Sequence, residues 1–234
     1  MTVILVLVTF LAFIILDYAL NRKKAVRTVP ATEPALANVA APLGVPIGPG
    51  SEYVHGFLTP DHVAYHPGHS WLVRERKHLV RVGVDEFAAA LAGKIERIEL
   101  PTPGQWIRQG QKALTFFRNG EKTEMASPTE GEVMEVNTEL VANPGILRSD
   151  PYGKGWLLAV HVPDEENTSR NLIPKGLVRE WMREAVERLY ALQPALAGAV
   201  APDGGHAVAD LLAEVPGANW REVTAEFFLT GAEK

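Results

Sequence analysis

Residues 115–136 read TFFRNGEKTEMASPTEGEVMEV, and this stretch decides the fold class. Apolar and polar residues alternate around Asn119 and Gly120, as they do in two half-buried strands joined by a turn. Asn and Gly both tolerate the positive φ angles that a two-residue hairpin turn requires. The stretch therefore predicts a β-hairpin with Asn119 and Gly120 at its tip, in which Arg118 faces Glu121.

Short β-type runs separated by Gly and Pro continue on both sides of this hairpin. Several short strands at close spacing are typical of a small barrel or sandwich. One short helix is expected at residues 85–91, where Asp85 can cap the first turn. The expected strands cover residues 78–83, 94–100, 113–118, 123–126, 132–136 and 156–162.

The pattern becomes helical in the last third of the chain. Residues 175–193 carry apolar residues at three- and four-residue spacing, which predicts a helix with one buried face. Shorter helices are expected at residues 207–215 and 220–229. We expect Phe227 and Phe228 to pack the last helix on the β-domain, with binding of a partner by this tail as the alternative.

The first 20 residues are strongly apolar, and residues 2–16 contain no charge. A helix of about 19 residues is about 28 Å long, enough to cross the hydrocarbon core of a bilayer. Basic residues follow the apolar run and none precedes it, which favours an uncleaved anchor with the rest of the chain in the cytoplasm over a cleaved signal peptide. The predicted parts are a transmembrane anchor (1–20), a basic flank with a Pro/Ala-rich linker (21–50), a β-domain (51–164) and a helical extension (165–234).

The composition excludes several classes of protein and site. The 234 residues include no cysteine, so disulfides, thiolate zinc sites and cysteine-ligated clusters are excluded. The formal net charge of −5 argues against a nucleic-acid surface, which needs concentrated Lys and Arg. No Ser-His-Asp order, phosphate-binding loop or metalloprotease motif occurs, and the carboxylates are isolated. We therefore expect no enzyme activity, no catalytic residue and no small-molecule substrate.

Five histidines lie between residues 55 and 78, and neutral imidazoles are good metal ligands. Their spacing does not define a coordination sphere, and no cysteine or His-x-x-x-His helix accompanies them. We therefore expect no metal site among them. They are His55, His62, His66, His69 and His78.

Several ordered strings carry a resemblance to a known family. They are YHPGHSW (65–71), VGVDEFA (82–88), IELP (98–101), GEVMEVN (131–137) and DPYGKGWL (150–157). Over about residues 57–164 the chain resembles the glycine cleavage system H protein, a carrier of the lipoyl-domain type. The resemblance implies a lipoyl-type barrel-sandwich hybrid of two small antiparallel sheets, mainly β with helical additions.

The resemblance also implies a site, because the family carries lipoate on one lysine at a hairpin tip. When the strings are aligned, Gly120 stands at that lysine position, and glycine has no amine to modify. Lys122 lies two residues further on, where it should face Phe117 within a strand. We expect Lys122 to be an ordinary solvated strand lysine, with lipoylation there as the alternative.

These expectations favour a membrane-anchored, H-protein-like module that is not lipoylated. It would be a non-catalytic accessory or scaffold subunit of a membrane-associated complex. The proteins with which members of the family work suggest a redox complex. The first alternative is a lipoyl carrier for glycine cleavage or a related pathway, modified at Lys122. The second is a periplasmic adaptor of an efflux pump, although the sequence lacks the long heptad runs of such adaptors.

Overall fold

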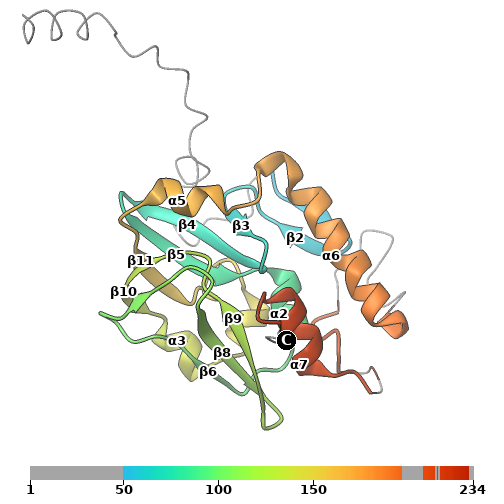
Figure 1. Ribbon diagram of the computed structural model, residues 1–234. Coiled ribbons are helices and arrows are strands. Elements are labelled where there is room, and N and C mark those ends of the chain that lie inside the picture. The colour runs from blue at the N-terminus through green and yellow to red at the C-terminus, as the bar shows by residue number, and fades with distance from the viewer. Residues whose placement is uncertain (1–49, 197–207, 214, 216, 232–234) are drawn as a thin grey trace, which may run out of the picture. The chain divides into compact units, whose positions relative to one another are not determined.

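Antiparallel sheets form the centre of the part of the chain that the computed structural model describes, which is residues 50–196, 208–213, 215 and 217–231 (Figure 1). A six-stranded sheet has the order β3-β4-β5-β11-β10-β7, a three-stranded sheet has the order β6-β8-β9, and β1 pairs with β2. The strands are β1 (Glu52–Val54), β2 (Phe57–Thr59), β3 (Ala64–His66), β4 (Ser70–Arg76), β5 (Leu79–Val84), β6 (Arg97–Glu99), β7 (Trp106–Ile107), β8 (Lys112–Arg118), β9 (Glu121–Ala126), β10 (Gly131–Val136) and β11 (Leu158–His161).

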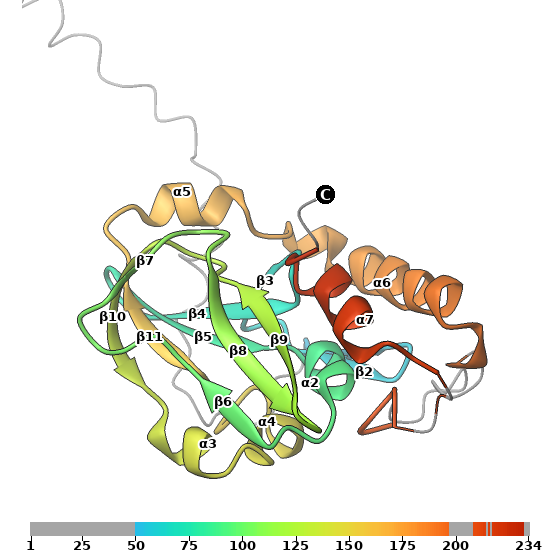
Figure 2. The ribbon, with the colours of Figure 1, turned by 60° about the horizontal axis from the view of Figure 1, so that its bottom comes forward.

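The three-stranded sheet lies across the six-stranded sheet, and the core fills the space between them (Figure 2). Alternation along each strand decides which side chains enter this core. Leu114, Phe116 and Met125 are buried from one sheet, while Val82 and Val160 are buried from the other. The observed architecture confirms the prediction of a mainly β fold with helical additions.

Helices surround the sheets at their edges. The helices of the described residues are α2 (Glu86–Ala92), α3 (Thr138–Ala142), α4 (Ile146–Ser149), α5 (Glu165–Arg170), α6 (Val178–Leu192) and α7 (Trp220–Phe227), with short 3-10 turns at Lys175–Leu177 and Pro194–Leu196. Asp85 caps α2, as predicted, because its Oδ1 accepts from the backbone N–H of Ala88 at 2.7 Å. Asn219 caps α7 in the same way.

The predicted stripe on the long helix is confirmed, because Met182, Ala185 and Leu189 of α6 are buried. The predicted packing of the last helix is also confirmed, since Phe227 and Phe228 are both buried.

Three predictions about elements need correction or lie outside the described residues. The expected strand at 94–100 is reduced to β6, whose backbone pairs with β8 only at Arg97–Glu99. The expected helix at 207–215 does not form in its described part, because residues 208–213 make bends and turns. The expected anchor at 1–20 lies outside the described residues. Among the helices that the structure does describe, none is both long and apolar enough for a bilayer crossing.

Candidate functional site

The hairpin of β8 and β9 has the predicted two-residue tip. Asn119 has φ of 51° and Gly120 has φ of 76°, both in the left-handed region that this turn requires. Arg118 pairs with Glu121 across the tip, and the next pair joins Phe117 to Lys122. The predicted register is therefore confirmed.

Gly120 is exposed at this tip, and the space around it is open. A Cβ atom built on Gly120 would meet nothing within 4 Å, so no neighbouring group shields the position. A lipoyl group needs a primary amine for its amide bond, and neither Asn119 nor Gly120 provides one. The residues at the position that the resemblance assigns to the family's lysine therefore do not fit lipoate.

Lys122 lies one residue inside β9 and points away from the core. Its neighbours Thr123 and Met125 alternate with it, and the side chains of both are buried. The Lys122 side chain is 57% exposed, and its Nζ lies 3.5 Å from a carboxylate oxygen of Glu124. This placement is that of a solvated strand lysine with one weak ion pair.

The base of the tip is held through Asp210, a residue that no sequence pattern had indicated. Arg118 Nη1 donates to the carbonyl of Ala92 at 3.3 Å and to Oδ1 of Asp210 at 3.0 Å. The other oxygen of Asp210 accepts from the backbone N–H of Lys94 at 3.1 Å. Asp210 belongs to the C-terminal extension, so this segment fixes the end of the hairpin against the end of α2.

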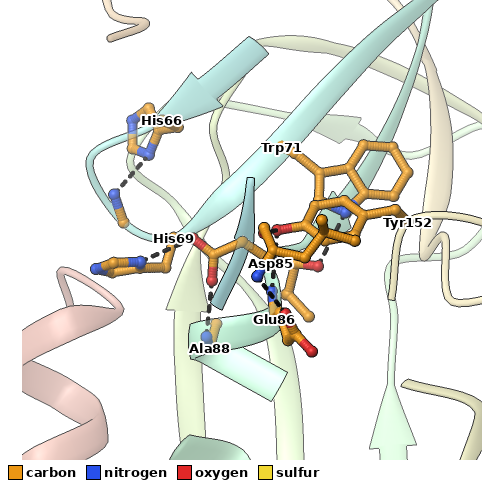
Figure 3. A network of polar contacts seen from close by, with 10 residues as sticks. His66, His69, Trp71, Asp85, Glu86, Ala88 and Tyr152 are labelled. Carbon is orange, nitrogen blue, oxygen red and sulfur yellow. Dashed lines mark hydrogen bonds and ion pairs between the residues drawn. The ribbon is translucent and has the colours of Figure 1, made fainter. Parts of the chain in front are cut away.

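The second feature is a buried pair of a histidine and an aspartate (Figure 3). Nδ1 of His69 lies 2.8 Å from Oδ2 of Asp85, and both residues are buried. Because a carboxylate accepts a hydrogen bond, Nδ1 of His69 carries the proton of this bond. The other ring nitrogen points away from Asp85 in Figure 3.

The pair depends on local backbone geometry. His69 has φ of 58°, in a turn where its N–H donates to the carbonyl of His66 at 3.0 Å. The backbone N–H of Asp85 in turn donates to the carbonyl of His69 at 3.0 Å. Both residues belong to strings that carry the family resemblance, but their separation in sequence gave no signal that they pair.

The His69 ring is packed between aromatic side chains from two helices. Trp181 of α6 stacks on it at 4.6 Å, and Phe87 of α2 lies at 4.4 Å on a tilted plane. A cleft of about 200 Å³ opens beside the ring. Its polar lining consists of Glu184, Arg188 and Glu226. Helices α6 and α7 therefore form most of the wall that faces His69.

A further network ties the string at 150–157 to the sheet. The hydroxyl of Tyr152 donates to the carbonyl of Leu58 at 2.7 Å and accepts from the backbone N–H of Glu86 at 3.2 Å. Burial raises the pKa of Tyr152 well above its usual value, so the hydroxyl stays protonated. Trp71 Nε1 donates to the carbonyls of Val84 and Pro151 (Figure 3).

The other histidines do not gather around a common centre. His66 is buried, its Nδ1 accepts from the N–H of Gly68 at 3.1 Å, and burial lowers its pKa to about 4. His55 and His78 occupy turns with positive φ. Within the described ranges, no three histidine or carboxylate side chains lie where they could hold one metal ion. The expectation that the chain binds no metal stays a prediction.

Comparison with known proteins assigns the family. The sequence model described as "Glycine cleavage H-protein" matches residues 63–185, which is just over half of the 234 residues. The chain belongs to the glycine cleavage H-protein family. The match reaches beyond the resemblance at 57–164 and into α6, so the first turns of this helix are part of the H-protein domain. Helix α7 lies beyond it.

Individual relatives agree with this assignment. The glycine cleavage system H protein of Mycobacterium leprae is 36% identical over 105 residues, which cover 45% of this chain and 80% of the relative. The H protein of Bifidobacterium longum is 33% identical over 107 residues, covering 46% of this chain and 77% of the relative. A solved H protein from Mycobacterium marinum aligns with a TM-score of 0.43 at 27% identity, over 45% of this chain and 87% of that one.

Proposed function

We propose that this H-protein-family domain is a protein-binding module that carries no lipoate at its hairpin tip. The observation that carries the proposal is Gly120, which occupies the family's lysine position in an open, left-handed turn. A module without the lipoyl arm has no thiol to transfer groups, so it is not an enzyme and not a carrier. Without that arm, the domain acts by binding other proteins through its folded surface.

The attachment of the tip to the rest of the fold supports this proposal. Arg118 is bonded to both Ala92 and Asp210, and the side chains of Arg118 and Asp210 are mostly buried. Such a hydrogen-bonded ion pair holds the hairpin more firmly than an exposed pair does. A rigid hairpin suits a fixed binding surface.

The sequence adds a location to this proposal. We propose that residues 1–20 anchor the chain in the cell membrane as a single span, with the H-protein domain in the cytoplasm. The module would then be an accessory or scaffold subunit of a membrane-associated complex, for which a redox complex is one candidate. Its partners would be proteins and the membrane, and neither nucleic acid nor a small-molecule substrate.

A second candidate function is that of a lipoyl carrier modified at Lys122. The observation in its favour is the exposure of the Lys122 side chain two residues from the tip. Against it stands the position of Lys122 in the body of β9, opposite Phe117, where the paired backbone cannot protrude as a turn does.

Intact-mass spectrometry separates the two functions. The full chain is co-expressed with a lipoate ligase and lipoate, with an ordinary H protein as the positive control. The proposal expects an unmodified chain beside a lipoylated control. A lipoyl adduct that disappears in Lys122→Ala would refute the proposal and establish the carrier. Lys112→Ala, which changes an exposed lysine at the other end of the same hairpin, is the matched control.

A further inference from the structure

An apolar groove lies between β6 and α3. It has a volume of about 430 Å³ and is formed by β6 and the segment after it, together with the end of β10 and helix α3. Leu100, Pro101, Val136 and Val141 provide its apolar wall. Val141 is 40% exposed.

Two large apolar side chains continue this surface. Trp106 on β7 is 48% exposed and Met134 on β10 is 51% exposed. Trp106 pairs with Glu132, and Met134 lies two residues further along β10, at a register shift between Val133 and Glu135. A turn closed by the N–H of Gln105 and the carbonyl of Thr102 connects the groove to Trp106. Trp and Met are enriched in protein interfaces, and exposed clusters of this kind mark binding sites.

Carboxylates border the apolar surface. Glu132 and Glu135 on β10 and Glu139 on α3 are all exposed. Within the part of the chain that the structure describes, no lysine, arginine or histidine forms an ion pair with these three side chains. Glu99, which also lines the groove, is paired with Arg97. Among the described residues, these three carboxylates therefore have no ion-pair partner.

We propose that this surface, formed by the groove, Trp106, Met134 and the three unpaired glutamates, binds a basic amphipathic segment of another protein. The apolar groove and Trp106 would receive the apolar side chains of the segment, and its lysines or arginines would meet the glutamates. The inference rests on the proposed function, because it names the kind of partner that the module binds. The surface lies at the side of the domain that carries β10, β6 and α3, whereas α7 lies at the other side (Figures 1 and 2).

Photo-crosslinking in living cells tests the proposal on the full chain. A benzophenone amino acid replaces Trp106, and in a matched control it replaces Leu177, which is 55% exposed on the 3-10 turn before α6. We expect a crosslink from position 106 that position 177 does not give. Mass spectrometry of the crosslinked peptide should identify a segment of another protein in which basic residues flank apolar ones.

The contribution of the three glutamates to partner binding is tested in the same experiment. Changing Glu132→Gln, Glu135→Gln and Glu139→Gln together should lower the crosslink yield about tenfold, because three charge pairs are lost. Glu187→Gln, at an exposed site on α6, should leave the yield unchanged. No crosslink above the control level, an acidic or uncharged segment, a second copy of this chain, or its own residues 21–27 would each overturn the proposal. A lipoylated chain with the expected crosslink would overturn the proposed function alone.

Discussion

Gly120 shows how much a single residue decides in this protein. The turn around it is the one that a two-residue hairpin requires, and the strands beside it keep the register that the sequence predicts. At the position that the resemblance assigns to the family's lysine no side chain is available for modification, and Phe117, Arg118 and Asn119 stand where the resemblance implies acidic and small residues. Because a Cβ on Gly120 would meet nothing within 4 Å, a lysine fits there without a clash. The remaining cost is the left-handed φ, about 1 kcal/mol for a residue other than glycine.

Gly120→Lys should therefore turn the tip into a substrate for lipoate ligase. We expect one lipoyl adduct by intact mass under conditions that leave the unaltered chain unmodified, with a loss of stability of about 1 kcal/mol. Gly104→Lys is the control, because Gly104 also has a positive φ and open space around it. Equal modification at both positions would show that the ligase reads exposure alone. No adduct on a folded Gly120→Lys chain would show that more than the lysine is missing.

His66 makes stability depend on pH. Burial lowers its pKa to about 4, against about 6.5 in the unfolded chain, so the unfolded state binds the proton first as the pH falls. Above pH 6.5, His66 therefore does not change the free energy of unfolding. Between pH 6.5 and pH 4, its titration lowers that free energy by about 3 kcal/mol in total. In His66→Asn the amide oxygen can accept the bond from Gly68, and no titration remains.

Urea unfolding of the full chain in a non-ionic detergent, at pH 7 and pH 5, measures this effect. The free energy of unfolding should fall between these pH values by about 2 kcal/mol more in the unaltered chain than in His66→Asn. Equal falls in both proteins would mean that another group is responsible for the acid sensitivity.

At the scale of elements, α7 and the residue after it cover the outer edge of the three-stranded sheet. The hydroxyl of Thr224 in α7 donates to the hydroxyl of Thr123 at 2.7 Å. The carbonyl of Phe228, directly after α7, accepts from the backbone N–H of Ala126 at 3.1 Å. These bonds cover the free edge of β9, which would otherwise present unpaired backbone groups. The expectation that the tail packs on its own domain is confirmed for the described residues.

Phe228→Ala should therefore destabilise the domain strongly, whereas Leu229→Ala should not. Phe228 is fully buried and lies 6.0 Å from Phe116, centroid to centroid, so its truncation leaves a cavity that costs about 3–5 kcal/mol. Leu229 is 50% exposed, and its loss should cost less than about 1 kcal/mol. Thermal unfolding of both variants checks the difference, and similar melting temperatures would mean that α7 is only loosely attached.

Local patterns predicted some elements well and contacts between elements poorly. The tip at Asn119 and Gly120 and the cap at Asp85 depend on neighbouring residues, so the sequence carries their signal directly. The bond from Arg118 to Asp210 joins residues far apart in the chain, and no periodicity encodes such a bond. The expected helix at 207–215 is replaced in its described part by turns, because Asp210 and the N–H of Leu211 bond to the region around α2 instead of to their own helix.

The same limit applies to the candidate site. The sequence identified Gly120 and Lys122 through an alignment of ordered strings, and the hairpin places both as expected. It did not reveal that His69 and Asp85 form a buried pair or that α6 covers the His69 ring, because these depend on how distant elements pack.

At the scale of the whole molecule, the sequence predicts that the module stays at the membrane. Residues 2–16 carry no charge, and basic residues follow at 22–24 and 27, so the positive-inside rule predicts a cytoplasmic location for residues 28–234. The full chain should remain in the membrane fraction after a carbonate wash. Val8→Arg with Leu11→Arg should release it, because each arginine adds about 3 kcal/mol to the cost of insertion. Val8→Ile with Leu11→Ile should leave it in the membrane.

A reporter fused to Lys234 tests on which side of the membrane the domain lies. A fluorescent protein fused there should be bright and a phosphatase fused there should be inactive, since the fluorophore matures in the cytoplasm and the phosphatase folds to its active form only outside the cytoplasm. An active phosphatase would place the domain on the far side of the membrane and exclude the cytoplasmic accessory role.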